Sequence, residues 1–414
     1  KRLRLKMQAV EDAHKKDLVQ EPGVLEGLDA REQGQSRYVA KYGPYPAWQN
    51  TRTQYFACGE AMYPQLLADL EKAEKSIFLE FFIVSHGCMW NGIEKILRRK
   101  AAQGVDVRLI YDDFGSLLGL PADFIVRMER AHIRCIPFNP VVPLLSLVMN
   151  HRDHRKIACI DGDVAYTGGV NIADEYANII ERFGYWKDSG VCLEGEGAWG
   201  LTASFIRMCV NLGGVMHNEH DYYRPHTPVK SEGFCQPFTD GPQNNPDNPA
   251  EDVFLQMISG ARRFLYITTP YFIPDESLMR ALCIAGDGGV DVRLMLPGKP
   301  DHWYADCVAE SYFGELIKHG VKVYRYTPGF LHGKSIMVDR EAAFVGSANM
   351  DYRSFELDYE CGVMVYSAPM IESLLEDMDM IVDHSRLVTK EEWAKRSVLR
   401  RVFEPLLRLF AIWM

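Results

Sequence analysis

The sequence lacks three features that would assign it to a class of protein at once. Its 10 cysteines are scattered and form no Cys-x-x-Cys pair, which excludes a small disulfide-rich module and favours reduced, buried thiols. No apolar run reaches the roughly 20 residues that cross a bilayer as a helix. Basic residues are not in excess, because 46 Lys and Arg stand against 56 Asp and Glu, for a net charge of −10. This balance disfavours a nucleic-acid-binding protein, although a local basic groove stays open as an alternative.

Clusters of metal-ligating side chains are equally scarce. The stretches "NHRDHRKIACIDG" (150–162) and "HNEH" (217–220) each hold two histidines with no third ligand nearby, unlike a zinc site. Asp112 and Asp113 follow an apolar strand, but the matching stretch 296–300 contains no acid, so we predict that they cap the strand end. We therefore expect neither a metal nor a cofactor.

Internal repeats divide the 414 residues, which are too many for one ordinary core. "GVDVRL" occurs at 104–109 and again at 289–294, and the apolar strands on either side of it also recur. The pattern predicts an α/β fold of two tandem lobes, each a mainly parallel or mixed sheet flanked by helices. The Pro-, Asn- and Asp-rich stretch 239–252 is the predicted linker between lobes at 51–238 and 253–390.

A longer repeat carries the polar residues. Residues 153–176 align with residues 331–354, and both copies follow the pattern His-x-Lys-x4-Asp-x6-Gly-Gly/Ser-x-Asn. Alternate residues of a strand share one face, so His154 and Lys156 are predicted to point the same way. The repeated positions are His154, Lys156, Asp161, Gly168, Gly169 and Asn171 in the first copy and His332, Lys334, Asp339, Gly346, Ser347 and Asn349 in the second.

These residue types suit phosphodiester exchange, which needs a nucleophile, a proton donor and positive charge around the phosphoryl oxygens. One neutral imidazole can attack phosphorus, while the other protonates the leaving alcohol and then deprotonates the incoming one. Lys156 and Lys334 are predicted to hold the phosphoryl oxygens, and Asn171 and Asn349 to donate amide hydrogens to them.

The small residues of the motifs are predicted to let the backbone approach the phosphate; they are Gly168, Gly169, Gly346 and Ser347. Asp161 and Asp339 end their strands, so we predict that they brace strand and turn. Glu80 lies in the apolar stretch "FLEFFI", and two alternatives stay open for it. It either faces the pocket as a substrate-binding residue or pairs with a buried cation.

The double motif closely resembles that of the phospholipase D superfamily over roughly residues 50–390. The flanking words "GVDVRLIYDDFGS" and "FGYWKDSGVCLEG" are most similar to those of bacterial cardiolipin synthases. The resemblance implies two lobes related by a pseudo-two-fold axis, with one shared active site. It further implies reversible phosphatidyl transfer between two phosphatidylglycerols, giving cardiolipin and glycerol through a phosphohistidine.

The resemblance also implies roles for individual residues. His154 is the expected nucleophile, and His332 the expected general acid and then base. Asp188 and Glu360 are each expected to contact and orient the histidine of the opposite half, and Asp161 and Asp339 belong to the family signature.

Two terminal segments and one internal stretch indicate a membrane. "PVVPLLSLVM" (140–149) is predicted to form an apolar lip, with a core segment as the alternative. Residues 391–414 contain four arginines among Leu, Phe, Ile and Trp, and are predicted to lie on an anionic membrane surface or to pack on the body. Because cardiolipin synthases of this kind have N-terminal transmembrane helices, residues 1–50, beginning "KRLRLK", are expected to follow such helices. The resemblance places the protein in a bacterial cell membrane, with its catalytic part facing the cytoplasm.

Several functions remain open at this point. The expected partners are phosphatidylglycerol, cardiolipin and the anionic membrane surface, without nucleic acid, and a homodimer is one option. A hydrolytic phospholipase D or a phosphatidylserine synthase needs the same residues and a different acceptor. A non-catalytic membrane scaffold is a remote alternative, against which the intact motifs in both halves argue.

Overall fold

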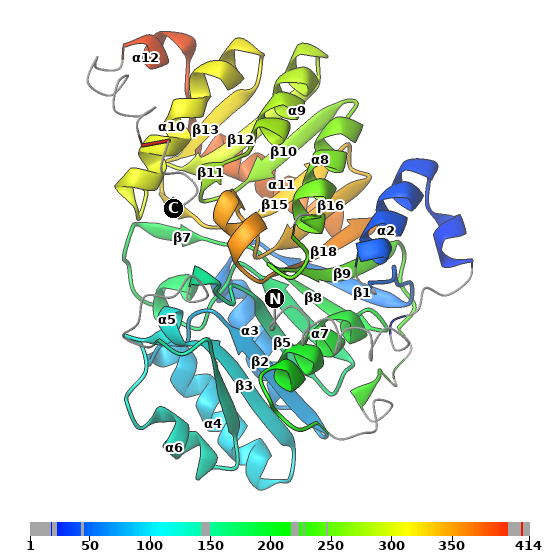
Figure 1. Ribbon diagram of the computed structural model, residues 1–414, viewed down its shortest axis with the longest axis vertical. Coiled ribbons are helices and arrows are strands. Elements are labelled where there is room, and N and C mark those ends of the chain that lie inside the picture. The colour runs from blue at the N-terminus through cyan, green and yellow to red at the C-terminus, as the bar shows by residue number, and fades with distance from the viewer. Residues whose placement is uncertain are drawn as a thin grey trace.

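A computed structural model describes residues 18, 23–42, 45–141, 150–216, 223–225, 227, 229–245, 247–395 and 407–408. The chain forms two lobes stacked along the long axis of the molecule (Figure 1). Of the predicted lip, residues 142–149 lie outside the described part, as do 396–406 and 409–414 of the C-terminal segment. Among the described helices, none combines the length and the apolar character needed to cross a bilayer.

The first lobe is built on a seven-stranded mixed sheet. Its strands, in spatial order, are β1 (Thr51–Phe56), β8 (Gly190–Gly195), β6 (Val164–Gly168), β5 (Lys156–Ile160), β2 (Ser76–Phe81), β3 (Asp106–Asp112) and β4 (Arg134–Phe138). Strands β2, β3 and β4 pair in parallel, and all the other neighbours pair antiparallel.

The second lobe repeats this order with one further strand at an edge. Its strands are β9 (Phe234–Asp240), β18 (Glu360–Tyr366), β16 (Ala342–Gly346), β15 (Ser335–Val338), β10 (Phe264–Thr268), β12 (Asp291–Pro297), β13 (Lys322–Tyr326) and β19 (Ser385–Leu387). The duplicated α/β fold predicted from the repeats is confirmed, and its parallel part is confined to three strands in each sheet.

Local chemistry explains why parallel and antiparallel parts coexist. Parallel neighbours need a crossover, which α4 (Cys88–Ala102) and α9 (Glu276–Asp287) supply between the first two parallel strands of each lobe. Antiparallel neighbours need only a tight turn, as at 161–163 between β5 and β6. Asp161 begins that turn with a φ of +55°, and Asp339 repeats the value in the second lobe.

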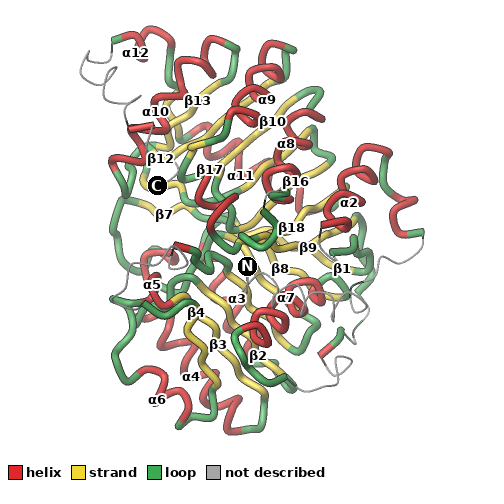
Figure 2. The backbone as a smooth tube through the Cα atoms, in the orientation of Figure 1, coloured by secondary structure: helices red, strands yellow, loops and turns green. Residues whose placement is uncertain are grey.

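Helices cover the outer faces of the sheets, and some of them also pack against strands of the opposite lobe (Figures 1 and 2). The remaining helices are α2 (Ala30–Tyr42), α3 (Gly59–Leu70), α5 (Asp113–Ser116), α6 (Phe124–Glu129), α7 (Ala198–Asn211), α8 (Pro249–Gly260), α10 (Trp303–Lys318), α11 (Met370–Asp383) and α12 (Lys390–Ala394), with shorter turns at η2 (Val24–Gly27), η4 (Asp174–Ala177) and η6 (Arg353–Leu357). Helix α7 of the first lobe packs against β9, and α11 of the second lobe packs against β1.

The apolar core runs from one lobe into the other. One buried cluster joins Phe78 and Ile157 of the first sheet to Met337 and Val363 of the second. Since burial of apolar surface is the main stabilising contribution to folding, this shared core holds the lobes in one fixed arrangement.

Two elements cross the predicted domain boundaries. Strand β9 straddles the boundary at residue 238 and pairs with β18 of the second sheet, and α8 begins inside the predicted linker 239–252. Apolar and polar residues do not alternate in the stretch "FCQPFTD" of β9, because both faces of the strand are buried. The sequence pattern therefore does not predict a strand here. The division of the chain into domains otherwise stays a prediction.

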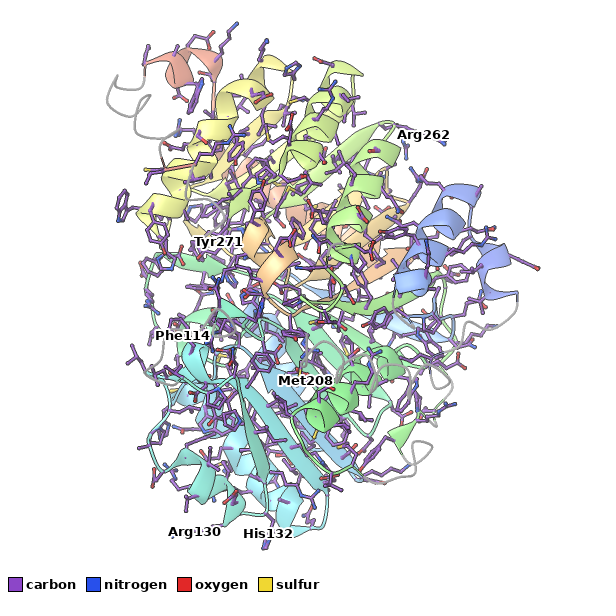
Figure 3. All side chains as sticks on the ribbon, in the orientation of Figure 1. Phe114, Arg130, His132, Met208, Arg262 and Tyr271 are labelled. Atoms are coloured by element: carbon purple, nitrogen blue, oxygen red, sulfur yellow. The ribbon has the colours of Figure 1, made fainter. Side chains whose placement is uncertain are left out.

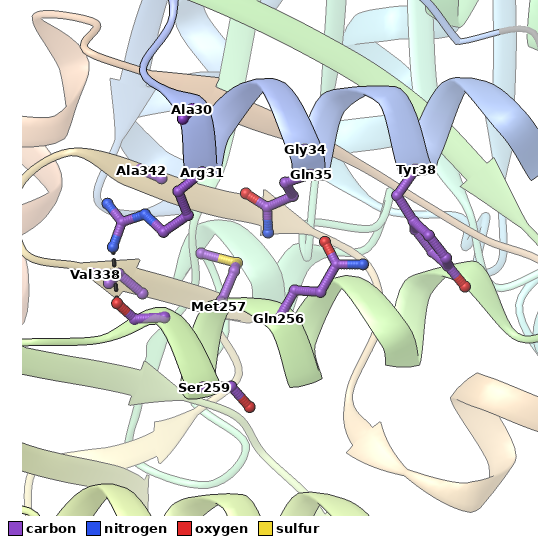
Figure 4. A pocket seen from close by; sticks show the side chains of 11 residues that line it. Ala30, Arg31, Gly34, Gln35, Tyr38, Gln256, Met257, Ser259, Val338 and Ala342 are labelled. Atoms are coloured by element: carbon purple, nitrogen blue, oxygen red, sulfur yellow. Dashed lines mark hydrogen bonds between the residues drawn. The ribbon is translucent and has the colours of Figure 1, made fainter.

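The described part of the predicted N-terminal segment lies on the second lobe. Helix α2 lies alongside α8, and the Arg31 guanidinium donates to the Gly260 carbonyl over 2.8 Å (Figure 4). A groove of about 480 Å³ remains between the two helices, lined by Gln35, Tyr38 and Met257 among others. The short strands β11 (Phe272–Ile273) and β17 (Met350–Asp351) pair elsewhere in this lobe.

Candidate active site

The lobes exchange backbone hydrogen bonds at the two motif histidines. In one direction, β14 (Gly329–Leu331) pairs in parallel with β7 (Tyr185–Lys187), and His332 N–H donates to the Lys187 carbonyl over 2.6 Å. In the other, His154 N–H donates to the Tyr359 carbonyl over 2.9 Å. Each histidine is thus fixed by the residue that immediately precedes an acid of the opposite lobe.

Those acids complete two histidine–carboxylate pairs. His154 Nδ1 donates to Glu360 Oε1 over 2.9 Å, and His332 Nδ1 donates to Asp188 Oδ2 over 2.7 Å. Both contacts join the two halves, as the resemblance implies. Because a carboxylate only accepts, each Nδ1 carries the proton and each Nε2 keeps a lone pair.

Further donors fix the acids. The Trp186 indole donates to Asp188 Oδ2 over 3.1 Å, and Ser189 N–H donates to its other oxygen over 2.8 Å. In the second pair, the Ser347 hydroxyl donates to Glu360 Oε2. Each carboxylate therefore accepts hydrogen bonds on both of its oxygens. These bonds fix the carboxylate, which in turn fixes the orientation of the histidine ring that it contacts.

The two motif lysines interact electrostatically with both motif histidines. Lys334 Nζ donates to the His332 carbonyl over 2.6 Å, and Lys156 Nζ donates to the His154 carbonyl. The charge of Lys334 lowers the pKa of His154 as well as that of His332, and the charge of Lys156 does the same to both. Each lysine thus affects the titration of the histidines of both lobes.

Burial sets the protonation of the site. Burial first, then the nearby lysines, lower the pKa of His154 to about 4 and that of His332 to about 3, against the opposing effect of the paired carboxylates. Burial alone would raise the pKa of Glu360, but His154 and Lys156 outweigh it and lower the value to about 2. His332 and Lys334 likewise hold the pKa of Asp188 below its usual range. At neutral pH both imidazoles are neutral and both carboxylates are ionised.

The lysines themselves lie near their titration point. Burial lowers the pKa of Lys156 to about 8 and that of Lys334 to about 7. A phosphodiester placed between them would favour the ammonium form of both, since a nearby negative charge raises the pKa of a cation.

Aromatic rings line the two histidines unequally. The Phe82 ring meets His154 edge-on at a centroid distance of 5.1 Å. Tyr176, Trp186 and Phe330 surround His332 at 5.4, 5.2 and 5.7 Å. Accordingly, the His154 side chain is 14% exposed and that of His332 is 8% exposed. None of these four rings was predicted from the sequence to lie at the site.

Asp161 and Asp339 point away from the chemistry. Asp161 accepts from three successive backbone N–H groups, Glu74 through Ser76, over 2.7–2.8 Å. Asp339 accepts from the N–H groups of Arg262, Arg263 and Phe264 over 2.8–2.9 Å. Each aspartate therefore ties its hairpin turn to the start of the neighbouring strand.

Asn171 is held by two hydrogen bonds. Its Oδ1 accepts from Ile83 N–H over 3.0 Å, and its Nδ2 donates to the Tyr176 hydroxyl over 2.9 Å. One of its two amide hydrogens therefore goes to the ring that packs on His332, and donation of the other to phosphate stays a prediction. Asn349 is also buried, and its Oδ1 has no hydrogen-bond partner among the described residues.

The small motif residues make room for protein atoms. A Cβ on Gly168 would lie 2.4 Å from the Ser189 carbonyl oxygen, and one on Gly346 would lie 2.5 Å from that of Cys361. A Cβ on Gly169 would lie 2.1 Å from Asp188 Oδ1. The neighbouring strand and the acid therefore already require small residues at these positions, and the approach of this backbone to phosphate stays a prediction.

Glu80 follows the second of its two alternatives. Its Oε1 accepts from the Arg155 guanidinium, which also donates to Asp153 Oδ1 over 2.8 Å. Glu80 pairs with Ile157 in the sheet, whereas its neighbour Phe81 pairs with Lys156, so Glu80 and Lys156 point to opposite faces. The substrate-binding assignment of Glu80 is corrected to a buried ion pair behind the site.

Metal-binding groups are not gathered here. The described residues contain no group of three His, Cys, Asp or Glu side chains arranged to hold a metal ion. Asp112 instead accepts from Phe114 N–H over 3.0 Å and from Asp153 N–H over 3.0 Å, as a strand-end cap does.

Comparisons with known proteins agree with this geometry. The family model described as "Cardiolipin synthase, PLD-like domain" matches residues 66–179 and 254–382. A cardiolipin synthase of Geobacillus kaustophilus is 36% identical over 377 residues, covering 91% of this chain and 75% of that protein. One of Halalkalibacterium halodurans is 35% identical over 389 residues, covering 94% and 77%.

A solved structure extends the likeness to the fold as a whole. The phosphatidylserine synthase of Haemophilus influenzae Rd KW20 superposes with a TM-score of 0.66 over 89% of this chain and 94% of that one, at 16% identity. Such low identity speaks for the fold alone. The family model and the curated relatives together establish that this chain is a member of the cardiolipin synthase family within the phospholipase D superfamily.

Proposed function

We propose that this protein joins two phosphatidylglycerol molecules into cardiolipin and glycerol through a phosphohistidine at His154. The observation that carries the proposal is the pair of histidine–carboxylate contacts, each assembled from both lobes. The family membership supports phosphatidyl transfer, and the relatives named as cardiolipin synthases support this acceptor.

The first half-reaction uses His154 as the nucleophile. Its Nε2 attacks phosphorus as the bond from phosphorus to the glycerol oxygen breaks, and the leaving oxygen takes a proton from Nε2 of His332. His332 must be an imidazolium for this step, although in the empty site its pKa is lowered to about 3. The negative charge of the bound diester raises that pKa, so substrate binding itself favours the proton that departure requires.

The second half-reaction reverses the proton transfer. Neutral His332 accepts a proton from a glycerol hydroxyl of the second phosphatidylglycerol, whose oxygen attacks phosphorus while the bond to His154 breaks. Lys156 and Lys334 neutralise the phosphoryl oxygens in both steps. Asp188 and Glu360 are positioning residues, which hold the tautomer of the opposite histidine.

An apolar rim formed by α5 and the two residues after it supports a lipid substrate. The rim consists of Phe114, Leu117 and Leu118, of which Leu118 is 100% exposed. Phe114 lies under the guanidinium of Arg152, two residues before His154, at 5.3 Å from ring centroid to Cζ. Phe114 and Tyr271 lie on the side of the molecule where the lobes meet (Figure 3). Exposed side chains of this kind suit a bilayer surface, which keeps acyl chains away from water.

The remaining assignments belong to the same proposal. The proposed partners are phosphatidylglycerol, cardiolipin and an anionic bilayer. The proposed location of the protein is the cytoplasmic face of a bacterial cell membrane. Whether a homodimer forms is left to a measurement of mass in detergent.

The decisive experiment supplies phosphatidylglycerol as the sole lipid and identifies the products by mass. Cardiolipin and glycerol in equal amounts are expected. Phosphatidic acid as the main product would replace the proposal with hydrolysis. A product that forms only when serine is added would replace it with phosphatidylserine synthesis.

A further inference from the structure

The second lobe contains a basic pocket that the proposed reaction does not use. It has a volume of about 640 Å³ and lies between α10, α12 and the ends of β12, β13 and β19. Its cationic lining residues are Lys299, Arg325, Arg386 and Lys395. The pocket opens beyond the carboxyl ends of the parallel strands β12 and β13, where open α/β sheets commonly bind ligands.

Two of these cations face each other directly. Arg325 of β13 and Arg386 of β19 are opposite partners in the antiparallel register. Opposite residues share one face of the sheet with Cβ atoms about 5 Å apart, and like charges there destabilise the pair. The chain has a net charge of −10, so the pairing of two arginines is not explained by a general excess of basic residues.

The protein itself satisfies this pair only in part. Arg325 Nη2 contacts Asp306 Oδ1 at 2.6 Å, and Arg386 Nη1 contacts Glu392 Oε2 at 2.6 Å. Arg325 is 8% exposed, and its Nη1 has no hydrogen-bond partner among the residues that the structure describes. A buried charged donor left without an acceptor costs free energy.

The local charge balance is positive. The carboxylates at the pocket are Glu310 and Glu392 in the lining and Asp306 behind Arg325. Four cations against three carboxylates leave an excess of one positive charge, in a cavity large enough for a tetrahedral oxyanion. The first lobe carries Asp112 and Asp113 at the equivalent strand end, so the feature belongs to the second lobe.

We propose that this basic pocket binds a phosphate group, supplied either by a lipid headgroup or by a soluble phosphate ester. Arginine presents paired N–H donors that match phosphate oxygens, and a phosphate between Arg325 and Arg386 would remove both the repulsion and the missing acceptor. The lipid source rests on the proposed function, whereas the soluble source does not.

The pocket is separate from the catalytic pair. None of the residues that line the pocket belongs to the two histidine motifs or to the acids that contact them. Lys299 lies in the loop before α10, whose first residue Trp303 is 63% exposed, and α5, α10 and α12 lie along the same side of the molecule (Figure 1). The basic pocket and the apolar rim therefore lie on the same side of the molecule. A bilayer that contacts the rim would place its lipid headgroups near the pocket.

The test measures acylation of individual lysines by mass spectrometry on the full chain. Inorganic phosphate or phosphatidylglycerol vesicles are added, with chloride and phosphatidylcholine vesicles as matched references. At phosphate about tenfold above its Kd, we expect Lys299 and Lys395 to react about tenfold more slowly. Lys390, exposed on the same helix α12 and outside the pocket, serves as the internal control and should be unchanged.

A variant separates a site from mere shielding by a membrane. Arg386→Gln should abolish the protection by both additives, while cardiolipin formation from detergent-solubilised phosphatidylglycerol stays within about twofold of the unaltered protein. Protection by phosphate as well as by vesicles identifies a general phosphate site, and protection by vesicles alone identifies the lipid headgroup. Absence of protection in both arms, or protection that survives in Arg386→Gln, would overturn the proposal whatever the product assay shows.

Discussion

The two halves surround equivalent histidines with different neighbours. His154 has one aromatic ring beside it and a glutamate behind it, whereas His332 has three rings and an aspartate. The more open imidazole suits a group that must form and release a covalent bond to a lipid. The more enclosed one suits a group that only passes a proton. The proposed division of roles between the two histidines therefore agrees with the difference in their surroundings.

The largest test of this division removes one histidine at a time. His332→Ala should slow transfer by about a hundred- to ten-thousand-fold and still accumulate label on His154 from a labelled donor. His154→Ala should form no phosphohistidine at all. Peptide mapping after a quench with denaturant at neutral to mildly alkaline pH, where the phosphorus–nitrogen bond survives, reads the label, and unfolding curves check that both variants fold. Label on His332 in the unaltered protein would reverse the roles.

A smaller effect is expected where the two motifs differ, at Gly169 and Ser347. Gly169→Ser places a Cβ 2.1 Å from Asp188 Oδ1 and must displace the acid, so we expect a loss of about 2–3 kcal/mol in stability and a matching loss of activity. Ser347→Gly removes one hydroxyl from Glu360 and should cost less. Thermal unfolding and initial rates decide the order. Equal tolerance of both changes would show that the acids are not held as described.

Asp161 and Asp339 should respond alike, because each caps three backbone N–H groups. Replacement by Ala is expected to lower the free energy of unfolding by about 1–3 kcal/mol in each half. Activity per folded molecule should stay within a few-fold, since neither carboxylate faces the imidazoles. Urea unfolding and rates on the folded fraction measure the two quantities. A large loss of rate without a loss of stability would give these aspartates a chemical role.

A still smaller effect concerns pH. The ordinary imidazole pKa is 6.5, and the folded values are lowered to about 4 for His154 and about 3 for His332. Between those values the unfolded chain binds protons that the folded chain does not, so the free energy of unfolding should fall as pH drops from 6.5 towards 4.

The carboxylates act in a lower window. The pKa of Glu360 is lowered from 4.5 to about 2, so its contribution is present above 4.5 and is lost only as pH falls towards 2. Urea unfolding at several pH values should therefore show a shallower slope between 6.5 and 4 in a variant with both histidines changed to Asn. An unchanged slope would mean that other groups govern this range.

Removal of metal ions is expected to have no effect on the transfer rate. Transfer should proceed at the same rate in EDTA, because two lysines supply the positive charge in both half-reactions. Rates with and without chelator, after dialysis, measure this. Loss of activity that a single divalent ion restores would require a metal between the halves.

Sequence reasoning reached the parts of the site that repeat. His154, Lys156, their counterparts and the acids Asp188 and Glu360 could be found because the same spacing occurs twice and resembles a known family. Reasoning failed where a role depends on the other strand or lobe.

Three residues illustrate the point. Nothing in the spacing says that Asn171 donates to Tyr176, that Gly169 faces a carboxylate, or that Glu80 meets Arg155. Strand β9 crosses the predicted boundary for the same reason, since its pairing partner β18 lies more than a hundred positions later.

The exchange of acids between lobes also fixes the order of events during synthesis. Glu360 leaves the ribosome 206 residues after His154, and His332 leaves it 144 residues after Asp188. A nascent first lobe therefore contains a histidine without its acid and an acid without its histidine. Neither histidine is oriented by its acid until the strands of both lobes are in place, so the proposed reaction cannot begin on a partly synthesised chain.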